Sequence, residues 1–216
     1  MTDTYEPTER TIPTRSRHRA SYDRALVHSI LDEAYVCHLG FVRDGAPVVL
    51  PTLYGRIGDR LYVHGSTGSR PVRMAGGSGP EAPGLPVCLT VTHVDGLVLA
   101  KSAFHHSINY RSVVVHGTAH QVTDPEELRT ALDALVDHVV PGRADDSRPA
   151  NARELAATAV LRLDLDEVSA SPNDEPEDAA LPHWAGVIPV RRAYDTPVPA
   201  EDLDPSVALP AYLTAV

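Results

Sequence analysis

The most informative stretch of the chain is Leu61-Tyr-Val-His-Gly-Ser-Thr-Gly-Ser-Arg-Pro-Val-Arg-Met74, in which an apolar strand breaks into small residues and arginines. Glycines let the backbone approach an anion closely, hydroxyls add hydrogen bonds, and Pro71 suits the first turn of a helix. Arg70 and Arg73 add positive charge at the start of that helix. The pattern is typical of a phosphate-binding loop. A plain connection between strand and helix often has the same composition, so the neighbouring segments have to be weighed as well.

Runs of β-forming residues surround this stretch. Residues 35–42 and 47–54 are separated by Asp44-Gly45, a strong hairpin signal, and a third strand is expected over 60–64. Few helices interrupt the strands, which indicates an antiparallel barrel with peripheral helices and not a doubly wound sheet. Further strands are expected over 86–93, 97–102 (after a turn at 94–96), 111–122 and 159–165. Helices are expected over 22–34 with Ser21 as cap, over 70–75, after Asp124 with Glu127 completing a capping box, and over 151–158.

The bulk properties fit one domain with two tails. A net charge of −10 over 216 residues disfavours nucleic acid and anionic membranes as partners, so small molecules or a second copy are expected. No apolar run has the length of a signal peptide or a membrane span, which predicts a cytoplasmic protein. We expect a flexible N-terminal arm over residues 1–20 and a cofactor-binding domain over 21–170. A Pro-rich and acidic extension over 171–216 is expected to pack on the barrel or on a partner subunit.

Familiar catalytic and metal motifs are missing from the sequence. The chain has eleven histidines, and His116 and His120 fall on one face of a strand, but no third ligand is spaced to join them. Cys37 and Cys88 lie in apolar runs and are interpreted as small buried side chains. We therefore expect no metal site. The sequence contains neither a nucleophile elbow nor a Walker loop, so it does not indicate serine hydrolysis or nucleotide hydrolysis.

A second polar cluster can converge with the loop at 65–70. Its members lie at 106–112. Pro51, Thr52 and Tyr54, which lie on the second strand, can join them. Together they offer cationic donors for a phosphate and aromatic side chains to flank a flat ring, which suits a phosphorylated aromatic cofactor. Alternatively, Tyr54 and Tyr110 lie at the rim of the core and Arg111 is solvated; the spacing leaves both interpretations open.

Three segments together resemble a known family. Val48-Val-Leu-Pro-Thr-Leu-Tyr54, Leu61-Tyr-Val-His-Gly-Ser-Thr-Gly-Ser-Arg70 and Ser107-Ile-Asn-Tyr-Arg-Ser-Val-Val-Val-His-Gly117 are similar, in order and spacing, to the pyridoxamine 5′-phosphate oxidase-like FMN-binding split-barrel proteins. The branch they resemble is the flavin-nucleotide-binding group that includes nitroimidazole-resistance proteins. The likeness covers residues 22–170 and resumes over 181–189. The chain lacks the basic, glycine-containing stretch that relatives carry after the last strand.

The resemblance implies a split β-barrel, mainly β with peripheral helices, that forms a homodimer with two FMN sites across its interface. His64 matches the histidine that faces the cofactor in the nitroimidazole-resistance branch, which makes it the candidate catalytic residue. The other implied cofactor-binding residues are Gly65, Ser66, Ser69 and Arg70 at the phosphate, Pro51, Thr52 and Tyr54 along the isoalloxazine ring, Tyr110, Arg111 and Ser112 closing the site, and Trp184.

Two functional hypotheses follow from the resemblance. The first is an FMN-dependent oxidoreductase that acts on a small acceptor such as a nitroaromatic or a quinone. The second is a non-catalytic flavin- or haem-binding protein for storage or sensing. Some branches of the fold bind haem or a deazaflavin in place of FMN, and His64, His105 or His106 could ligate a haem. Pyridoxamine phosphate oxidation is not expected, because the sequence has no second basic cluster for a second phosphate.

Overall fold

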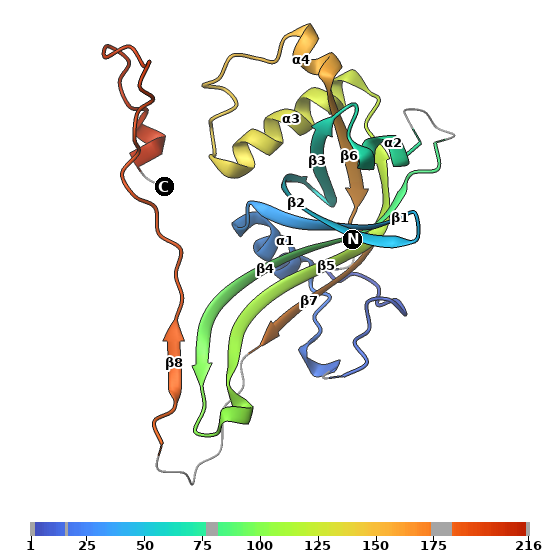
Figure 1. Cartoon of the computed structure of the whole chain (residues 1–216), viewed down its shortest axis with the longest axis vertical. Coiled ribbons are helices and arrows are strands. Elements are labelled where there is room, and N and C mark those ends of the chain that lie inside the picture. Colours follow the sequence, from blue (N-terminus) through green and yellow to red (C-terminus); the bar gives the residue numbers. More distant parts are fainter. Residues whose placement is uncertain (1–2, 16, 77–81, 174–182, 215–216) are drawn as a thin grey trace.

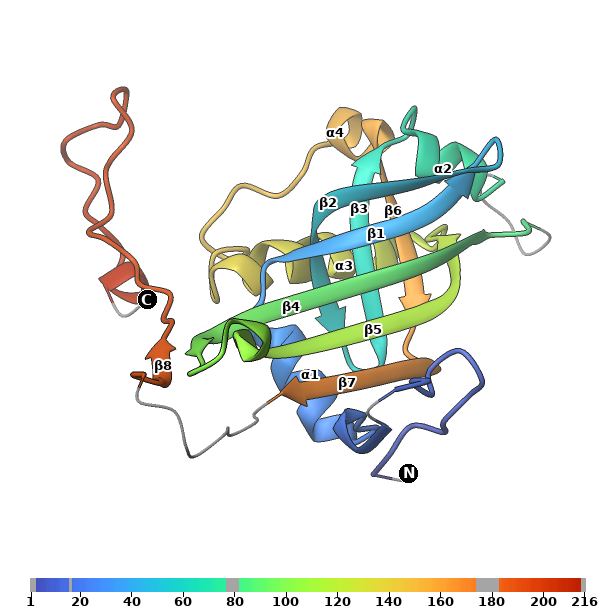
Figure 2. The same ribbon diagram turned by 60° about the horizontal axis from the view of Figure 1, so that its bottom comes forward.

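Six antiparallel strands close into a ring in the computed structural model, which describes residues 3–15, 17–76, 82–173 and 183–214 (Figure 1). The ring runs in the order β5-β6-β3-β2-β1-β4, and pairing of β4 with β5 closes it. Two outer strands extend it: β7 pairs with β5 (Figure 2), and β8 pairs with β4. The bounds are β1 Val36–Arg43, β2 Ala46–Ile57, β3 Arg60–Ser66, β4 Leu85–Leu99, β5 Ser107–Gln121, β6 Thr158–Asp164, β7 Glu167–Asn173 and β8 Gly186–Pro189. The predicted split barrel is thereby confirmed.

Helices lie outside this ring. Helix α1 (Arg24–Glu33) covers one end of the barrel, α2 (Arg70–Met74) follows β3, and α3 (Pro125–Val139) packs on β2 and β3. The remaining helices are α4 (Ala152–Ala157) and the short 3₁₀ turns η1 (Arg17–Arg19), η2 (Ala103–His105) and η3 (Ala211–Thr214). In the part of the chain that the structure describes, no helix is long and apolar enough to cross a bilayer.

The β1–β2 hairpin forms as predicted. Asp44 and Gly45 both have positive φ, at 51° and 77°, and Arg43 pairs with Ala46 across them. Two consecutive residues in the left-handed region make the tight turn whose twist matches that of the flanking strands. The Asp-Gly pair thus fixes the register of the first two strands.

The predicted turn at 94–96 is wrong. Strand β4 runs without a break from Leu85 to Leu99 and carries a β-bulge between Val94 and Gly96. Strand β5, which begins at Ser107 rather than at 111, pairs with both halves, so the chain has no need to reverse there. Asp95 in the bulge receives two hydrogen bonds from Arg111, a long-range contact that local sequence does not reveal.

Two other expectations need correction. Helix α1 is capped by Asp23, whose carboxylate accepts a hydrogen bond from the amide of Leu26, and not by Ser21, whose backbone pairs with Ala170. The strand expected last, 159–165, is followed by β7 and β8. Strand β7 alternates over only two buried residues, Val168 and Ala170, and β8 is four residues long and mostly exposed, so neither has a periodic pattern long enough to predict a strand.

The cap of α3 is Asp124 as predicted, but Glu127 does not complete a capping box. The Asp124 carboxylate accepts the amides of Glu126 and Glu127 at 3.0 and 2.7 Å. The side chain of Glu127 instead accepts a hydrogen bond from the hydroxyl of Tyr62 on β3 at 2.9 Å. The helix is thereby joined to the barrel at its first turn.

Strand β3 separates two apolar cores. Leu61 and Val63 belong to the main core inside the barrel, whereas Tyr62 between them packs in a second core under α3. Helix α3 approaches β2 so closely that a Cβ at Gly55 would lie 3.0 Å from the amide nitrogen of Leu135. The outer face of β2 and β3 is therefore packed against the helix at Gly55 and Tyr62.

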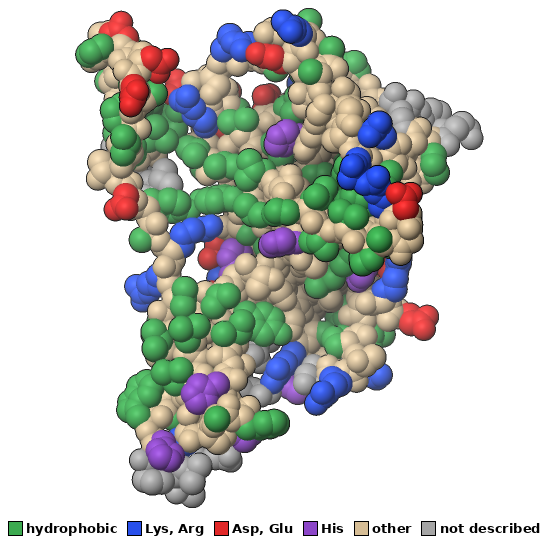
Figure 3. All heavy atoms as spheres, in the orientation of Figure 1, with side chains coloured by type: hydrophobic (Ala, Val, Ile, Leu, Met, Phe, Trp, Pro, Cys, Tyr) green, Lys and Arg blue, Asp and Glu red, His purple; other side chains and the backbone are tan. Residues whose placement is uncertain are grey.

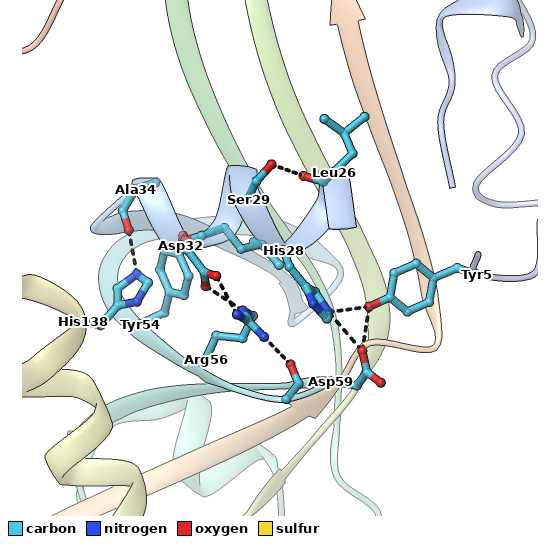
Figure 4. Close-up of polar contacts among 12 residues, drawn as sticks. Tyr5, Leu26, His28, Ser29, Asp32, Ala34, Tyr54, Arg56, Asp59 and His138 are labelled. Carbon is cyan, nitrogen blue, oxygen red and sulfur yellow. Dashed lines mark hydrogen bonds and ion pairs between the residues drawn. The ribbon is translucent and has the colours of Figure 1, made fainter. Parts of the chain in front are cut away.

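The N-terminal segment packs against the barrel, although the sequence predicted a flexible arm over 1–20. Tyr5 is 2% exposed and belongs to the main core. Its hydroxyl donates to Asp59 at 2.8 Å, and Asp59 also contacts His28 at 3.0 Å (Figure 4). Arg24 donates to the other carboxylate oxygen of Asp59 at 2.6 Å. The burial of Tyr5 and its hydrogen bond to Asp59 thus hold this segment on the barrel, although its composition is polar. Burial opposes ionisation of Asp59, but these hydrogen bonds outweigh it and hold its pKa below the ordinary value.

We expect Asp59→Asn to lower the free energy of unfolding by about 1 kcal/mol at neutral pH, because charged hydrogen bonds at a partly exposed site are lost. The folded-state pKa lies below the unfolded one, so the carboxylate stabilises the fold above about pH 4 and loses this effect as the pH falls through the folded value. Denaturant titrations across that range should show the difference shrinking in acid. The exposed Asp166→Asn is the control, and a pH-independent difference would contradict the account.

Candidate functional site

The loop between β3 and α2 is a preformed turn. The amide of Ser69 donates to the carbonyl of Ser66 at 2.8 Å, and the amide of Gly68 donates to the Ser66 hydroxyl at 3.2 Å. The amide of Thr67 donates to the carbonyl of Ala157 at 3.0 Å. The amides of Thr67, Gly68 and Ser69 are therefore already paired within the protein. The turn holds its shape by itself, and a ligand has to be bound mainly by side chains.

Side-chain donors remain at this turn. Ser69 occupies the cap position of α2, yet its hydroxyl makes no capping hydrogen bond. A Cβ at Gly65 would lie 3.1 Å from the Ser69 hydroxyl oxygen, so the glycine lets this hydroxyl lie against β3. Arg70 and Arg73 are exposed and form no ion pair with any residue that the structure describes. One hydroxyl and two guanidinium groups are the donors that suit a phosphate.

A small cavity of about 120 Å³ opens beside this turn. Four residues predicted from the sequence line it or border it: Thr52, His64, Gly65 and Ser69. Its other walls are apolar and come from β1, β2, α2 and β6 (Leu39, Leu50, Val63, Pro71, Val72 and Leu161). The structure thus brings the second strand and the loop together as the sequence analysis expected.

A second and larger cavity, of about 600 Å³, also has His64 in its wall. Residues of α3 and of the α3–α4 connection form most of this wall; the connection contributes Arg143 and Arg148, and β2 contributes Leu53. The apolar lining includes Leu53, Leu132, Leu135, Val136, Val139, Val140 and Leu155. Sequence reasoning missed this cavity because it assigned the whole apolar face of α3 to barrel packing. The one signal of this cavity in the sequence was the pair of arginines that follows the helix, Arg143 and Arg148.

His64 borders both cavities. It follows Tyr62 on the outer face of β3, where the pleat directs it towards α3, while Gly65 beside it lies on the barrel side. The imidazole is exposed and makes no hydrogen bond with any described residue. A histidine with both ring nitrogens unused can serve as a hydrogen-bonding group or as a ligand.

Comparison with known proteins now places the chain. The family model described as pyridoxamine 5′-phosphate oxidase matches residues 23–172. The chain belongs to this family. No curated protein matches it.

Solved structures agree with this assignment. The flavocytochrome Anf3 from Azotobacter vinelandii is 35% identical, covers 98% of each chain and has a TM-score of 0.87. The FAD- and haem-binding protein from Mycobacterium smegmatis is 36% identical, covers 91% of this chain and 96% of its own, and has a TM-score of 0.83. A 5-nitroimidazole antibiotic resistance protein from Bacteroides thetaiotaomicron, 22% identical over 70% of this chain and 84% of its own with a TM-score of 0.57, shares the fold.

Tyr54, which the family resemblance assigned to the ring of the cofactor, faces neither cavity. Its side chain is fully buried, its hydroxyl donates to the carbonyl of Leu31, and its ring lies 4.7 Å from that of His138 (Figure 4). Burial raises the pKa of Tyr54 and lowers that of His138. Tyr54 shares a face of β2 with Thr52 but lies two residues further on, where it belongs to the core.

The remaining predicted residues do not reach the two cavities within one chain. Arg111 forms ion pairs with Asp95 at 2.8 Å and Glu33 at 2.6 Å, and through its hydrogen bonds it holds the pKa of both carboxyls below their ordinary values. Trp184 is 69% exposed. Tyr110, Ser112 and Pro51 line neither cavity. Among the described residues, no three His, Cys, Asp or Glu side chains are grouped to hold a metal ion.

Proposed function

We propose that the protein is a flavin-dependent oxidoreductase that also binds haem, with the two cofactors on either side of His64. The observation that carries the proposal is the pair of cavities that share His64 in their walls. When bound, a flavin supplies one- and two-electron chemistry and a haem supplies one-electron chemistry. The chain itself would bind and orient both groups, and a small acceptor such as a quinone or nitroaromatic would be the substrate.

The flavin nucleotide would bind at the small cavity with its phosphate at the turn. Ser69, Arg70 and Arg73 supply hydrogen bonds and charge that no described residue uses, and Thr52 lies across the cavity from them. We propose FAD in place of the FMN expected from the sequence, because the Mycobacterium smegmatis relative is described as binding FAD and haem. Both nucleotides carry the same flavin phosphate, so the donors at the turn suit either one.

The haem would occupy the larger cavity. Its apolar wall suits a flat macrocycle, and its volume of about 600 Å³ is that of a typical cofactor pocket. His64 offers an imidazole ligand from one side. Arg143 and Arg148 also line this cavity and could pair with the two carboxylates of a haem. Each arginine also contacts an acidic neighbour, Asp146 for Arg143 and Glu154 for Arg148. The Azotobacter and Mycobacterium relatives are described as a flavocytochrome and a haem-binding protein.

The working form would be a homodimer. Apolar side chains stay exposed on β1 and β2, and Figure 3 shows hydrophobic side chains gathered in a band across the molecule. Val42 and Val49 are 62% and 60% exposed, and Val36 is 45% exposed. Such a face on a sheet is typical of an interface between subunits. A second copy seated there could bring Tyr110, Ser112 and Trp184 towards the cofactor of its partner.

We expect Arg70→Ala to weaken FAD binding by about 1.5–3 kcal/mol, roughly tenfold to a hundredfold, because a charged hydrogen bond to phosphate is lost. Titration of apoprotein followed by flavin fluorescence measures this. The loss should vanish when riboflavin, which has no phosphate, is the ligand. Arg129→Ala on α3 is the matched control. Unchanged FAD affinity in Arg70→Ala would exclude Arg70 from the site.

We expect His64→Ala to lower haem affinity by about tenfold or more and to change the Soret band, because the imidazole that would ligate the haem is removed. Added imidazole should restore the original band by entering the space left by the side chain. His120→Ala, on the outer part of β5, is the control. An unaltered Soret band in His64→Ala would show that another residue ligates the haem.

A further inference from the structure

We propose that the C-terminal arm, residues 186–214, binds to a second copy of this chain. The proposal rests on the homodimer proposed above and adds the element that holds the two copies together. It names the partner as another molecule of the same protein, on whose surface the arm lies. The supporting observations are the exposure of the arm, its few contacts with its own barrel, and its match to a solved relative.

The arm has no core of its own. Every residue from 187 to 209 is exposed in the single chain, and several of them are apolar. Val198 is 90% exposed and Val207 is 55% exposed, with Leu203 and Leu209 at 44% and 50%. A segment of this kind loses conformational entropy on ordering without burying enough apolar surface to offset the loss. Something outside the chain therefore has to cover it.

Contacts with its own barrel fix both ends of the arm but bury little of it. Strand β8 pairs with β4 over four residues, and the hydroxyls of Tyr194 and Tyr35 are hydrogen-bonded to each other. The amide of Val190 donates to the carbonyl of Asp95 at 2.9 Å, and Arg192 donates to the carbonyl of Glu33 at 2.6 Å. The hydroxyl of Tyr212 donates to Asp146 at 2.7 Å near the far end. Between these anchors the arm stands away from the body, and open gaps are visible between them in Figure 3.

The arm also presents an apolar hollow. Its volume is about 680 Å³, and arm residues form nearly all of its wall, together with Arg143 and Asp146 of the α3–α4 connection. The apolar members are Pro197, Val198, Pro199, Leu203, Val207, Leu209, Pro210 and Leu213. Prolines restrict the backbone before binding and so reduce the entropy lost on docking. A stiff, apolar, uncovered hollow fits an apolar protein surface.

A solved relative matches the chain throughout this region. The Azotobacter structure covers 98% of the chain at a TM-score of 0.87, and the arm has more residues than the remaining 2%. The match therefore includes most of an arm that has no core in its own chain. An arm that recurs without a core of its own is held by a neighbour, and in closed oligomers that neighbour is a copy of the same chain. The exposed face of β1 and β2 offers such a copy an apolar surface.

A photo-crosslinking experiment on the full-length protein tests this. A benzophenone amino acid replaces Leu203, and ¹⁵N-labelled and unlabelled chains are mixed, allowed to exchange and irradiated. We expect a covalent dimer on a denaturing gel, with mixed-isotope crosslinks that join position 203 to the barrel of the other chain. Crosslinks confined to one chain, or none at all, would overturn the proposal. Flavin and Soret absorption spectra of the same samples test the proposed cofactor binding independently of the crosslinking result.

A pair of charge substitutions provides the second readout. Leu203→Glu with Val207→Glu should raise the dimer dissociation constant at least tenfold in analytical ultracentrifugation, because two apolar contacts would become buried charges. Thr196→Glu with Thr214→Glu adds the same charge to the arm without removing an apolar side chain, and should change the constant less than threefold. Equal constants for the two double variants would overturn the arm proposal alone. A wild-type protein that is monomeric while it binds flavin would overturn both the arm proposal and the proposed homodimer, and would leave the flavin site standing.

Discussion

The alternation of side chains along β3 is the constraint on which both cavities depend. Leu61 and Val63 have to face the barrel core, so Tyr62 and His64 have to face α3. Pairing on both sides holds this register, with Val63 opposite Tyr54 on β2 and His64 opposite Val160 on β6. A slip by one residue would place a histidine in the core and two aliphatic side chains outside. The position of His64 is thus set by the stability of the barrel.

The end of the same strand produces the turn that we propose binds the flavin phosphate. Gly65 gives Ser69 room, and the amides that follow are paired with Ser66 and Ala157. The turn is therefore ordered before any ligand arrives, which lowers the entropic cost of binding. Electrostatic attraction then falls to Arg70 and Arg73, in a chain whose net charge of −10 makes a local positive site unusual. The two arginines would attract a small anion to this turn although the net charge of the molecule repels anions.

Local patterns allowed much of the fold to be predicted, and non-local contacts explain most of the errors. The Asp44-Gly45 turn and the cap at Asp124 are set by neighbouring residues, and both form as expected. The bulge at Asp95 depends on Arg111, sixteen residues away, and the packing of Tyr5 depends on Asp59. Neither partner is visible in a short window of sequence.

The sequence likewise predicted part of the candidate site and missed the rest. Thr52, His64, Gly65 and Ser69 meet because adjacent strands carry them. Tyr54 was assigned to the cofactor from the resemblance, yet the burial of its ring depends on α1 and α3, whose packing a strand pattern does not describe. The larger cavity is enclosed by elements from three parts of the chain, and only the folded structure reveals it.

The central claim is that one exposed imidazole separates a flavin site from a haem site. The most direct test is the visible absorption spectrum of the protein as purified, with each chromophore extracted and quantified per chain. The account predicts flavin bands together with a Soret band, at close to one flavin and one haem per chain when the protein is supplied with both. A protein that takes up flavin but never shows a Soret band would contradict the two-site account, and a colourless protein that takes up neither would contradict it entirely.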